Sequence, residues 1–282
     1  MKTCKMYVGG SFIRSESGKV LPAVAADGKT TLAQVCRASR KDFRDAVVAA
    51  RKAFGKWSGM TAYLKGQILY RTAEMLEMRA GEMELELMRS TGVNATAARR
   101  EVADAVELLV HYAGWSDKFT AVFGSVNPVS SPHFNFTYPE ATGVVVVVCP
   151  DKPSFVPFVH LVAATIVTGN TCIVLPSETA PLPALTFSEI LATSDLPAGV
   201  VNILSGPRAD LAPTAATHMD VNAIVNACED PALDKTLHEG TATNMKRYAR
   251  HSVPAGDWRL ADRPQWMLDT IEFKTAWHPI GW

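Results

Sequence analysis

Five cysteines are the first side chains in this sequence that could carry nucleophilic or metal chemistry. They form no C-x-x-C pair and no spacing typical of a metal site, and their number is odd. Cys228 stands where a helix is expected to begin, which can lower a thiol pKa, but Glu229 and Asp230 follow it directly and oppose that effect. We therefore expect free, buried thiols, no metal ion and no catalytic cysteine. The cysteines are Cys4, Cys36, Cys149, Cys172 and Cys228.

The composition is that of an ordinary globular protein and excludes several function classes. The chain has 282 residues, with 28 Lys and Arg against 28 Asp and Glu, and 48% of it is hydrophobic. A net charge of zero lacks the positive field that nucleic-acid binding needs, so we expect no nucleic-acid partner. The most apolar run, residues 144–149, is far shorter than the roughly 20 residues of a membrane helix. Residues 1–10 lack the apolar core of a secretory signal, so we expect a cytoplasmic protein without membrane contact.

The first half of the chain predicts short strands followed by helices. Gly9-Gly10 and Ser17-Gly18 are turn signals that indicate hairpins of a small sheet within residues 6–22. Apolar residues three or four positions apart then predict amphipathic helices over about 40–55, 63–79, 82–88 and 94–122. Ser39 is expected to be the N-cap of the first helix. Residues 133–138 alternate with period two, which predicts a strand.

The second half alternates strands with helices. Residues 143–148 form a continuous β-branched run, typical of a strand buried on both faces in a parallel sheet. Further strands are expected near 171–175, 200–204, 221–225 and 245–250, with a helix before each, so we predict an α/β, Rossmann-like open parallel sheet preceded by N-terminal helices. Residues 271–277 alternate again and predict an edge strand with one buried face, a plausible docking element for another subunit.

Three motifs of this second half follow one another in the order of a known family. They are Gly169-Asn170-Thr171 before a strand, Leu175-Pro176-Ser177-Glu178 after it, and Leu196-Pro197-Ala198-Gly199-Val200-Val201-Asn202 leading to Gly206. In this order they resemble the NAD-binding half of the aldehyde dehydrogenase superfamily, and the resemblance covers roughly residues 7–250. It implies a cofactor-binding-like domain of residues 1–126 and 141–252, small oligomerisation strands at 127–140 and 265–282, and a linker, 253–264, that replaces the catalytic domain.

The resemblance also implies where a dinucleotide would bind. The family directs an L-K-P-S-E motif toward the adenosine ribose, and Pro176, Ser177 and Glu178 match it whereas Leu175 replaces the lysine. Gly206 matches the glycine that ends the third motif. The resemblance therefore implies a vestigial cofactor site of Glu178, Ser177, Pro176 and Gly206. NAD binding stays possible, but we expect no cofactor.

The family's phosphate-binding turn, F-T-G-S-x-x-x-G, is replaced in this sequence. Asn226-Ala227-Cys228-Glu229 occupies the place of F-T-G-S, and Leu233 stands where the second glycine belongs. A side chain and the carboxylates of Glu229 and Asp230 would then lie in the path of a pyrophosphate, and like charges repel. We expect this turn to bind no phosphate tightly.

The catalytic residues that the resemblance implies are missing as well. The oxyanion loop P-W-N-F-P falls on residues 150–154, so Lys152 replaces the asparagine that would stabilise the reacting oxygen. We interpret Lys152 as a solvated loop residue rather than a Schiff-base amine. His251 replaces the glutamate base, and we interpret it as a surface or strand-end histidine rather than a base. The roughly 30 residues from Ser252 onward are too few for a catalytic domain with a nucleophile.

Three functions stay open at this point. We expect first a non-catalytic aldehyde-dehydrogenase-like subunit, similar to the degenerate second half of class-16 aldehyde dehydrogenases, that assembles with itself or with a complete aldehyde dehydrogenase. The alternatives are an NAD(P)-dependent aldehyde oxidoreductase with a remodelled site and a nucleotide or metabolite sensor. Tryptophans are enriched at interfaces, and those near the chain's end favour docking through that segment. They are Trp258, Trp266, Trp277 and Trp282.

Overall fold

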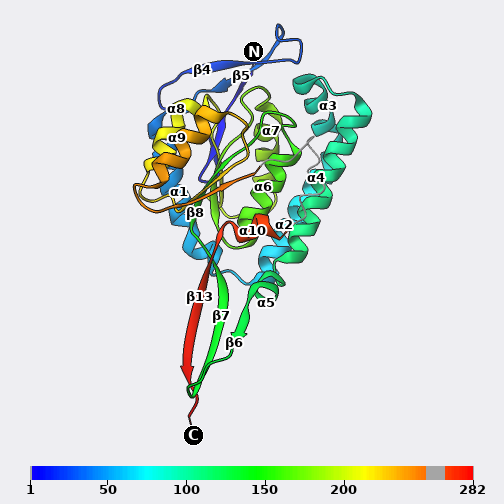
Figure 1. Cartoon of the computed structure of the whole chain (residues 1–282). Helices are drawn as coiled ribbons and strands as arrows, with labels where there is room; N and C mark the ends of the chain where they lie inside the picture. Colours follow the sequence, from blue (N-terminus) through cyan, green and yellow to red (C-terminus); the bar gives the residue numbers. More distant parts are fainter. Residues whose placement is uncertain (1, 252–263, 282) are drawn as a thin grey trace.

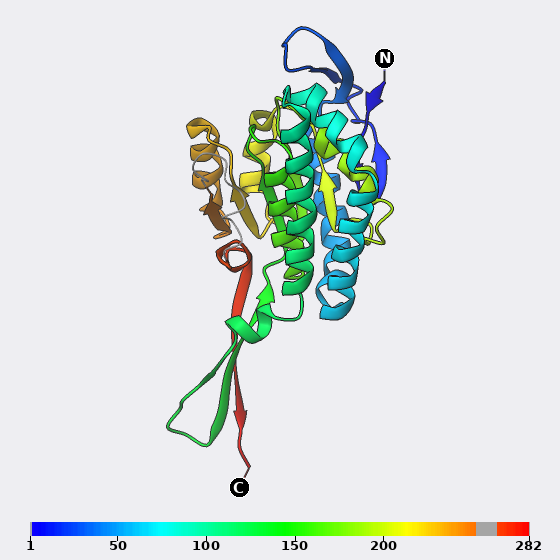
Figure 2. The same cartoon turned by 90° about the vertical axis from the view of Figure 1, so that its right-hand side faces the viewer.

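A computed structural model of the chain describes residues 2–251 and 264–281 (Figure 1). Its body is a seven-stranded sheet covered by helices on both faces, and a three-stranded sheet projects from one end of the body (Figures 1 and 2). The chain is therefore an α/β protein with a Rossmann-like sheet, as the sequence predicted. None of the helices that the structure describes is long and apolar enough to cross a membrane.

The large sheet has a parallel centre and an antiparallel edge. Its strands, in spatial order, are β12 (Arg247–Arg250), β11 (Ala223–Asn226), β8 (Val144–Val148), β9 (Thr171–Leu175), β10 (Val201–Ile203), β2 (Met6–Val8) and β3 (Ser11–Ile13). The first five are parallel; β2 runs antiparallel to β10, and β3 runs antiparallel to β2. The chain begins the parallel sheet at β8, continues to one side through β9 and β10, and then adds β11 and β12 on the other side. The strand order therefore reverses between β8 and β11.

The five valines of β8 explain why its sequence shows no alternation. Val144, Val146 and Val148 belong to the apolar core on one face of the sheet, and Val145 and Val147 belong to the core on the other face. All of them are fully buried. A strand that is covered by helices on both faces needs apolar residues at every position.

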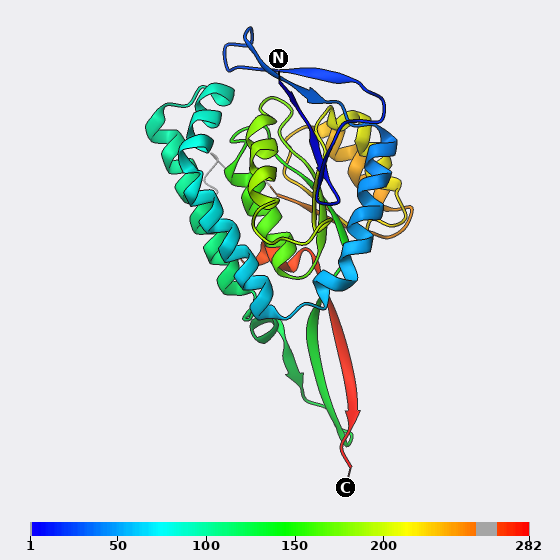
Figure 3. The same ribbon diagram turned by 180° about the vertical axis from the view of Figure 1, so that it is seen from behind.

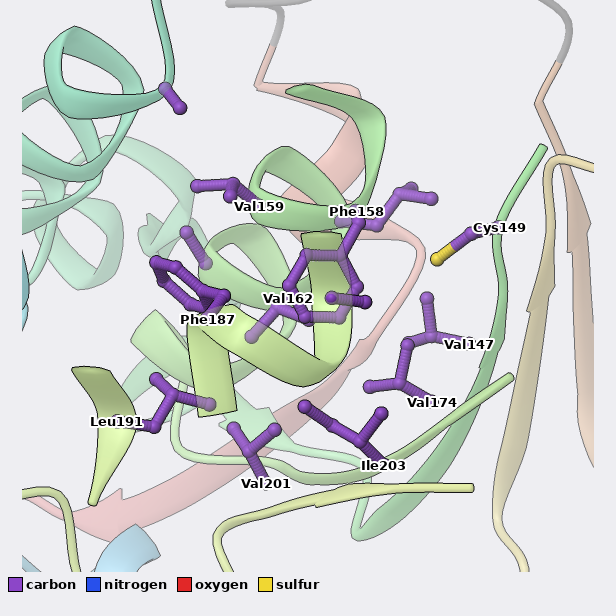
Figure 4. Packing of buried hydrophobic residues seen from close by; sticks show 14 of the residues in the cluster. Val147, Cys149, Phe158, Val159, Val162, Val174, Phe187, Leu191, Val201 and Ile203 are labelled. Atoms are coloured by element: carbon purple, nitrogen blue, oxygen red, sulfur yellow. The ribbon is translucent and has the colours of Figure 1, made fainter. Parts of the chain in front are cut away.

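The helices cover both faces of the sheet, in a single layer on one face and in two layers on the other. They are α1 (Arg40–Ser58), α2 (Ala62–Met78), α3 (Ala80–Thr91), α4 (Ala95–Trp115), α5 (Phe119–Phe123), α6 (Val156–Val167), α7 (Leu182–Leu191), α8 (Arg208–Thr217), α9 (Pro231–Thr241) and α10 (Gln265–Leu268). Helices α1, α8 and α9 cover one face, whereas α6 and α7 cover the other beneath α2, α3 and α4 (Figure 3). Phe158 of α6 and Phe187 of α7 meet edge to face above Val174 of β9 (Figure 4).

Two smaller sheets complete the fold. Strands β1 (Thr3–Cys4), β5 (Thr31–Cys36) and β4 (Val20–Val24) form one, and β13 (Ile271–Pro279), β7 (His133–Ala141) and β6 (Ser125–Asn127) form the projecting one. Strand β13 pairs antiparallel with β7 along its whole length, from Ile271 opposite Ala141 to Pro279 opposite His133. The strand predicted near the end of the sequence thus exists and lies at an edge.

The prediction that this last strand has one buried face was wrong. Ile271 is buried, but Phe273 is 49% exposed and Trp277 is 58% exposed. The physical reason is that β13 leaves the body together with β7, so most of its length extends beyond the helices (Figure 2). Trp266 behaves differently from Trp277, since it is buried against His160 of α6; Trp258 and Trp282 lie outside the described residues.

Three other expectations can be compared with the structure. The Gly9-Gly10 turn joins β2 and β3 as a hairpin, but Ser17-Gly18 does not, because the chain passes there into another sheet, where β4 pairs with β5. The long helix expected over 94–122 is interrupted after Trp115, where the hydroxyl and the amide of Ser116 both donate to the carbonyl of Ala113. The predicted linker, residues 253–264, lies outside the described residues apart from its last position.

Candidate functional site

The candidate site lies at the carboxyl ends of the parallel strands, where the strand order reverses. In open α/β sheets this is the edge at which ligands bind. The loops that meet there follow β8 at Asp151, β9 at Pro176, and β11 at Cys228, and helix α8 begins beside them at Arg208. Sequence reasoning identified the β9 loop but did not single out Asp151 or Arg208.

Arg208 joins the loops that meet at this edge of the sheet. The residue is only 2% exposed. Its guanidinium donates to both carboxylate oxygens of Asp151, with Nη2 to Oδ1 at 2.9 Å and Nη1 to Oδ2 at 3.1 Å. Nε and Nη2 also donate to the carbonyl of Pro176 at 3.2 and 3.0 Å, and Nη1 donates to Sγ of Cys228 at 3.1 Å. All N–H groups of the guanidinium are therefore used within the chain.

The residues predicted to form a vestigial cofactor site gather around this arginine. One carboxylate oxygen of Glu178 accepts the backbone N–H of Arg208 at 2.7 Å. The hydroxyl of Ser177 lies 3.1 Å from Oδ1 of Asp151 and accepts the amide of Ala180 at 3.0 Å. Glu178, Ser177 and Pro176 are thus brought together, and each of them already has a partner at this crevice.

Gly206 serves a different contact. Its φ is +133°, and a Cβ at this position would lie 3.1 Å from the backbone nitrogen of Ala38. The glycine therefore allows the loop after β10 to approach the segment before α1. Among the described residues, no hydrogen bond joins Gly206 to the carboxylates around Arg208.

The charges of the crevice stabilise one another. Burial opposes ionisation of Asp151, but the Arg208 guanidinium and the amides of Glu178 and Thr179 outweigh it, so the pKa of Asp151 lies below its usual value. Burial raises the pKa of the neighbouring Cys149 thiol to about 12, despite the nearby Arg208. Cys149 is therefore a neutral core thiol at physiological pH.

The turn that precedes α9 carries its own cap. Oδ1 of Asp230 accepts the backbone N–H groups of Ala232 at 2.8 Å and Leu233 at 3.2 Å. A helix N-terminus offers such N–H groups to anions, and here a carboxylate of the chain has taken them. Leu233 is buried in the core between the sheet and α8.

The other residues that the sequence analysis considered for chemistry are Lys152, His251 and the cysteines, and they do not form one site. Lys152 is exposed, as expected for a solvated loop residue. His251 stacks on Trp266, with ring centroids 3.7 Å apart, and its Nε2 lies 3.1 Å from Oδ2 of Asp269. These contacts join the end of β12 to the segment that leads into β13. All cysteines are free, and all except the partly exposed Cys4 are buried, so the expectation of burial was wrong for that residue alone.

Within the described ranges, no group of His, Cys, Asp and Glu side chains could hold a metal ion. The missed residues Asp151 and Arg208 did carry a signal in the sequence. Asp151 comes shortly after the buried strand β8, and Arg208 begins α8 after the loop that follows β10, so both lie beyond the carboxyl ends of parallel strands. Because β9 lies between these two strands, the sequence places the opposite charges at one edge of the sheet without showing that they pair.

Comparison with known proteins places this arrangement in a family. Residues 12–250 match the model of the aldehyde dehydrogenase family. The chain is 32% identical over 250 residues to the cytosolic 10-formyltetrahydrofolate dehydrogenase of Xenopus tropicalis, covering 86% of this chain and 27% of that protein. It is also 32% identical over 248 residues to the putative aldehyde dehydrogenase DhaS of Bacillus subtilis, covering 87% of this chain and 49% of that protein.

Solved structures agree with these relatives. The NAD+ complex of an aldehyde dehydrogenase from Bacillus cereus superimposes with a TM-score of 0.82 at 26% identity, covering 89% of this chain and 51% of that one. This chain thus spans about half the length, or less, of the proteins that it matches. The chain belongs to the aldehyde dehydrogenase family.

Proposed function

We propose that this chain is a non-catalytic, aldehyde-dehydrogenase-like subunit that assembles with itself or with a complete aldehyde dehydrogenase. The observation that carries the proposal is the buried guanidinium of Arg208, which is paired with Asp151 at the carboxyl ends of the strands. A ligand entering there would have to displace Arg208 from Asp151 and Pro176. Breaking a buried pair leaves an uncompensated charge, which is strongly unfavourable.

The capped turn before α9 supports the same conclusion. A pyrophosphate would meet the carboxylate of Asp230 at the amides that it needs, and the side chain of Leu233 would stand where close approach needs a glycine. Together with Arg208, these residues do not fit a dinucleotide. We therefore derive no reaction step through NAD for this chain.

The projecting sheet supports the assembly. Within the described chain, β13 has one neighbouring strand, β7, so its outer edge offers unpaired backbone groups. An exposed edge of this length is a template for pairing with another chain. Phe273 and Trp277 on β13 and Phe134 on β7 are exposed apolar side chains that an added subunit would cover. We propose that another copy, or a complete aldehyde dehydrogenase subunit, pairs there.

Aldehyde turnover by the purified chain tests the non-catalytic part of the proposal. We expect no reduction of NAD or NADP with aliphatic or aromatic aldehydes above a control without protein. Turnover would overturn the proposal and favour an NAD(P)-dependent aldehyde oxidoreductase with a remodelled site, the alternative that family membership supports. Saturable binding of a nucleotide without turnover would favour a nucleotide or metabolite sensor.

The assembly needs a separate experiment. We expect light scattering after size exclusion to give a mass above that of one chain, either for the purified chain alone or after co-expression with a complete aldehyde dehydrogenase. A monomer under both conditions would contradict the proposed partner role. It would have no bearing on the separate prediction that the chain turns over no aldehyde.

A further inference from the structure

A cavity of about 500 Å³ lies at the end of the sheet opposite to Arg208. Helix α5 and the root of the projecting sheet, which lie side by side (Figures 1 and 3), both contribute to its wall. Its walls come from the end of α1, the start of α2, α5 and β7. They are formed by Phe54, Ser58, Gly59, Ala62, Lys65, Ser116, Phe119, Thr120, Tyr138, Pro139, Glu140, Ala141 and Thr168.

Lys65 is the unusual member of this wall. It is only 6% exposed, and its Nζ donates one hydrogen bond, to the carbonyl of Ser58 at 3.2 Å. Among the residues that the structure describes, no carboxylate lies within ion-pair distance of it. Burial lowers the pKa of Lys65, and no charged neighbour contributes to that shift. An ammonium group is therefore buried beside a cavity without a counter-charge.

The other polar groups of the wall do not compensate this charge. Glu140 is the acid of the cavity, but it forms an ion pair with Lys274 and accepts a hydrogen bond from Tyr138. The hydroxyls of Ser116 and Thr168 donate to backbone carbonyls. Burying an ion without a partner is costly, so an anion that reached Lys65 would be bound favourably.

The shape and the remaining walls define the ligand further. A volume of about 500 Å³ falls within the range of small-molecule sites. Phe54, Phe119 and Pro139 supply apolar wall in addition to the cation of Lys65. We propose that this cavity binds a small monocarboxylate with an apolar body, whose carboxylate accepts hydrogen bonds from Lys65. The proposal does not depend on the non-catalytic role proposed above, because no hydrogen bond or ion pair of the described residues joins this wall to Asp151 or Arg208.

Calorimetric titration of the full chain with benzoate tests the site, with benzamide as the neutral molecule of the same shape. We expect saturable binding of benzoate and at least about tenfold weaker binding of benzamide, because a hydrogen bond to a charged group contributes that much affinity. The variant Lys65→Met keeps a long side chain and removes the charge. We expect it to weaken benzoate binding about tenfold or more.

The variant Lys118→Met is the matched control. Lys118 lies just before α5 and is exposed, so the substitution changes the net charge equally without touching the cavity wall. It should leave benzoate binding unchanged. If both variants lost benzoate binding equally, the loss would reflect general attraction of the anion to surface charge, and the proposal would be overturned.

Two further results would also overturn it. One is the absence of benzoate binding to the unmodified chain. The other is equal binding of benzoate and benzamide by that chain. Both results come from the unmodified chain, so they test the proposal even if Lys65→Met fails to fold. Inorganic phosphate provides the last comparison. If phosphate displaced benzoate at a phosphate concentration below that of the benzoate present, the site would be assigned to phosphate. That result would contradict a monocarboxylate ligand.

Discussion

Nη2 of Arg208 lies 2.9 Å from Oδ1 of Asp151 and joins the start of α8 to the loop after β8. The two residues come from opposite sides of β9, whose following carbonyl, at Pro176, accepts two further hydrogen bonds from the same guanidinium. This contact closes the edge of the sheet at which a ligand would enter. It therefore links the stability of the body to the proposal that this edge binds no dinucleotide.

Replacing Asp151 should destabilise the chain. In Asp151→Ala, the guanidinium of Arg208 stays buried without its counter-charge. Removing one partner of a fully buried pair costs about 3–5 kcal/mol, and we expect about 2–3 kcal/mol here because the Asp151 side chain is 37% exposed and therefore partly screened by solvent. Urea unfolding followed by circular dichroism measures this difference.

Asp210 provides a control for that substitution. It pairs with Arg37, but both side chains are about two-fifths exposed, at 41% and 39%. Exposed ion pairs contribute about 0–1 kcal/mol, so Asp210→Ala should change the unfolding free energy by less than 1 kcal/mol. Equal effects of the two alanine substitutions would contradict the structural role that we assign to the buried guanidinium.

Acid should remove the contribution of Asp151. The pKa of this carboxyl is lowered in the folded chain, so the contribution is complete above the ordinary aspartate pKa of about 3.9. It is lost as the pH falls through the lower pKa of the folded state. The difference in unfolding free energy between the unmodified chain and Asp151→Asn should therefore shrink as the pH falls below about 4. A difference that stays constant over this range would show that the carboxylate charge does not act.

His160 predicts a second, separate pH dependence. Burial and the nearby His251 and His111 lower the pKa of His160 to about 3, so the folded chain keeps this imidazole neutral. The unfolded chain binds a proton below about pH 6.5, and stability should consequently fall from pH 6.5 downward by up to about 1.4 kcal/mol per pH unit. His160→Leu should lose this part of the slope in chemical unfolding at pH 4.5, 5.5 and 6.5. An unchanged slope would mean that His160 titrates normally in the fold.

The exposed apolar residues of β13 should control assembly. We expect Phe273→Glu combined with Trp277→Glu to reduce the mass measured by light scattering, because charges on this edge oppose pairing with another chain. The unfolding free energy of the body should change little, since both side chains are exposed. Met219→Glu, at a residue 72% exposed on the body, serves as the control and should leave the mass unchanged. An assembly that survives the double substitution would place the interface elsewhere.

Much of the fold could be predicted because local patterns determine it. The valine run of β8 and the capping serine at position 39 specify buried strand and helix start by themselves. The pairing of β4 could not be predicted, because the turn at Ser17-Gly18 fixes a local bend and not the sheet that the next strand joins. The exposure of β13 also depended on the absence of a packing partner, which alternation alone does not reveal.

The site was predicted only in part for a similar reason. Family motifs located Glu178, Ser177 and Pro176 at the carboxyl edge of the sheet. The side chain that fills this edge belongs to Arg208, at the start of α8, and its partner Asp151 lies in the loop after β8. A motif describes one loop at a time, whereas a crevice is closed by contacts among several loops, so the ion pair became visible only in three dimensions.

The most direct test of the account is a thermal unfolding titration of the unmodified chain with NAD up to millimolar concentration. The account predicts an unchanged unfolding temperature, because Arg208 and Asp230 already hold the groups that a dinucleotide would need. Binding would instead stabilise the chain progressively, by about 2.7 kcal/mol at 100 times the dissociation constant. A saturable rise in unfolding temperature that Glu178→Gln abolishes would contradict the account.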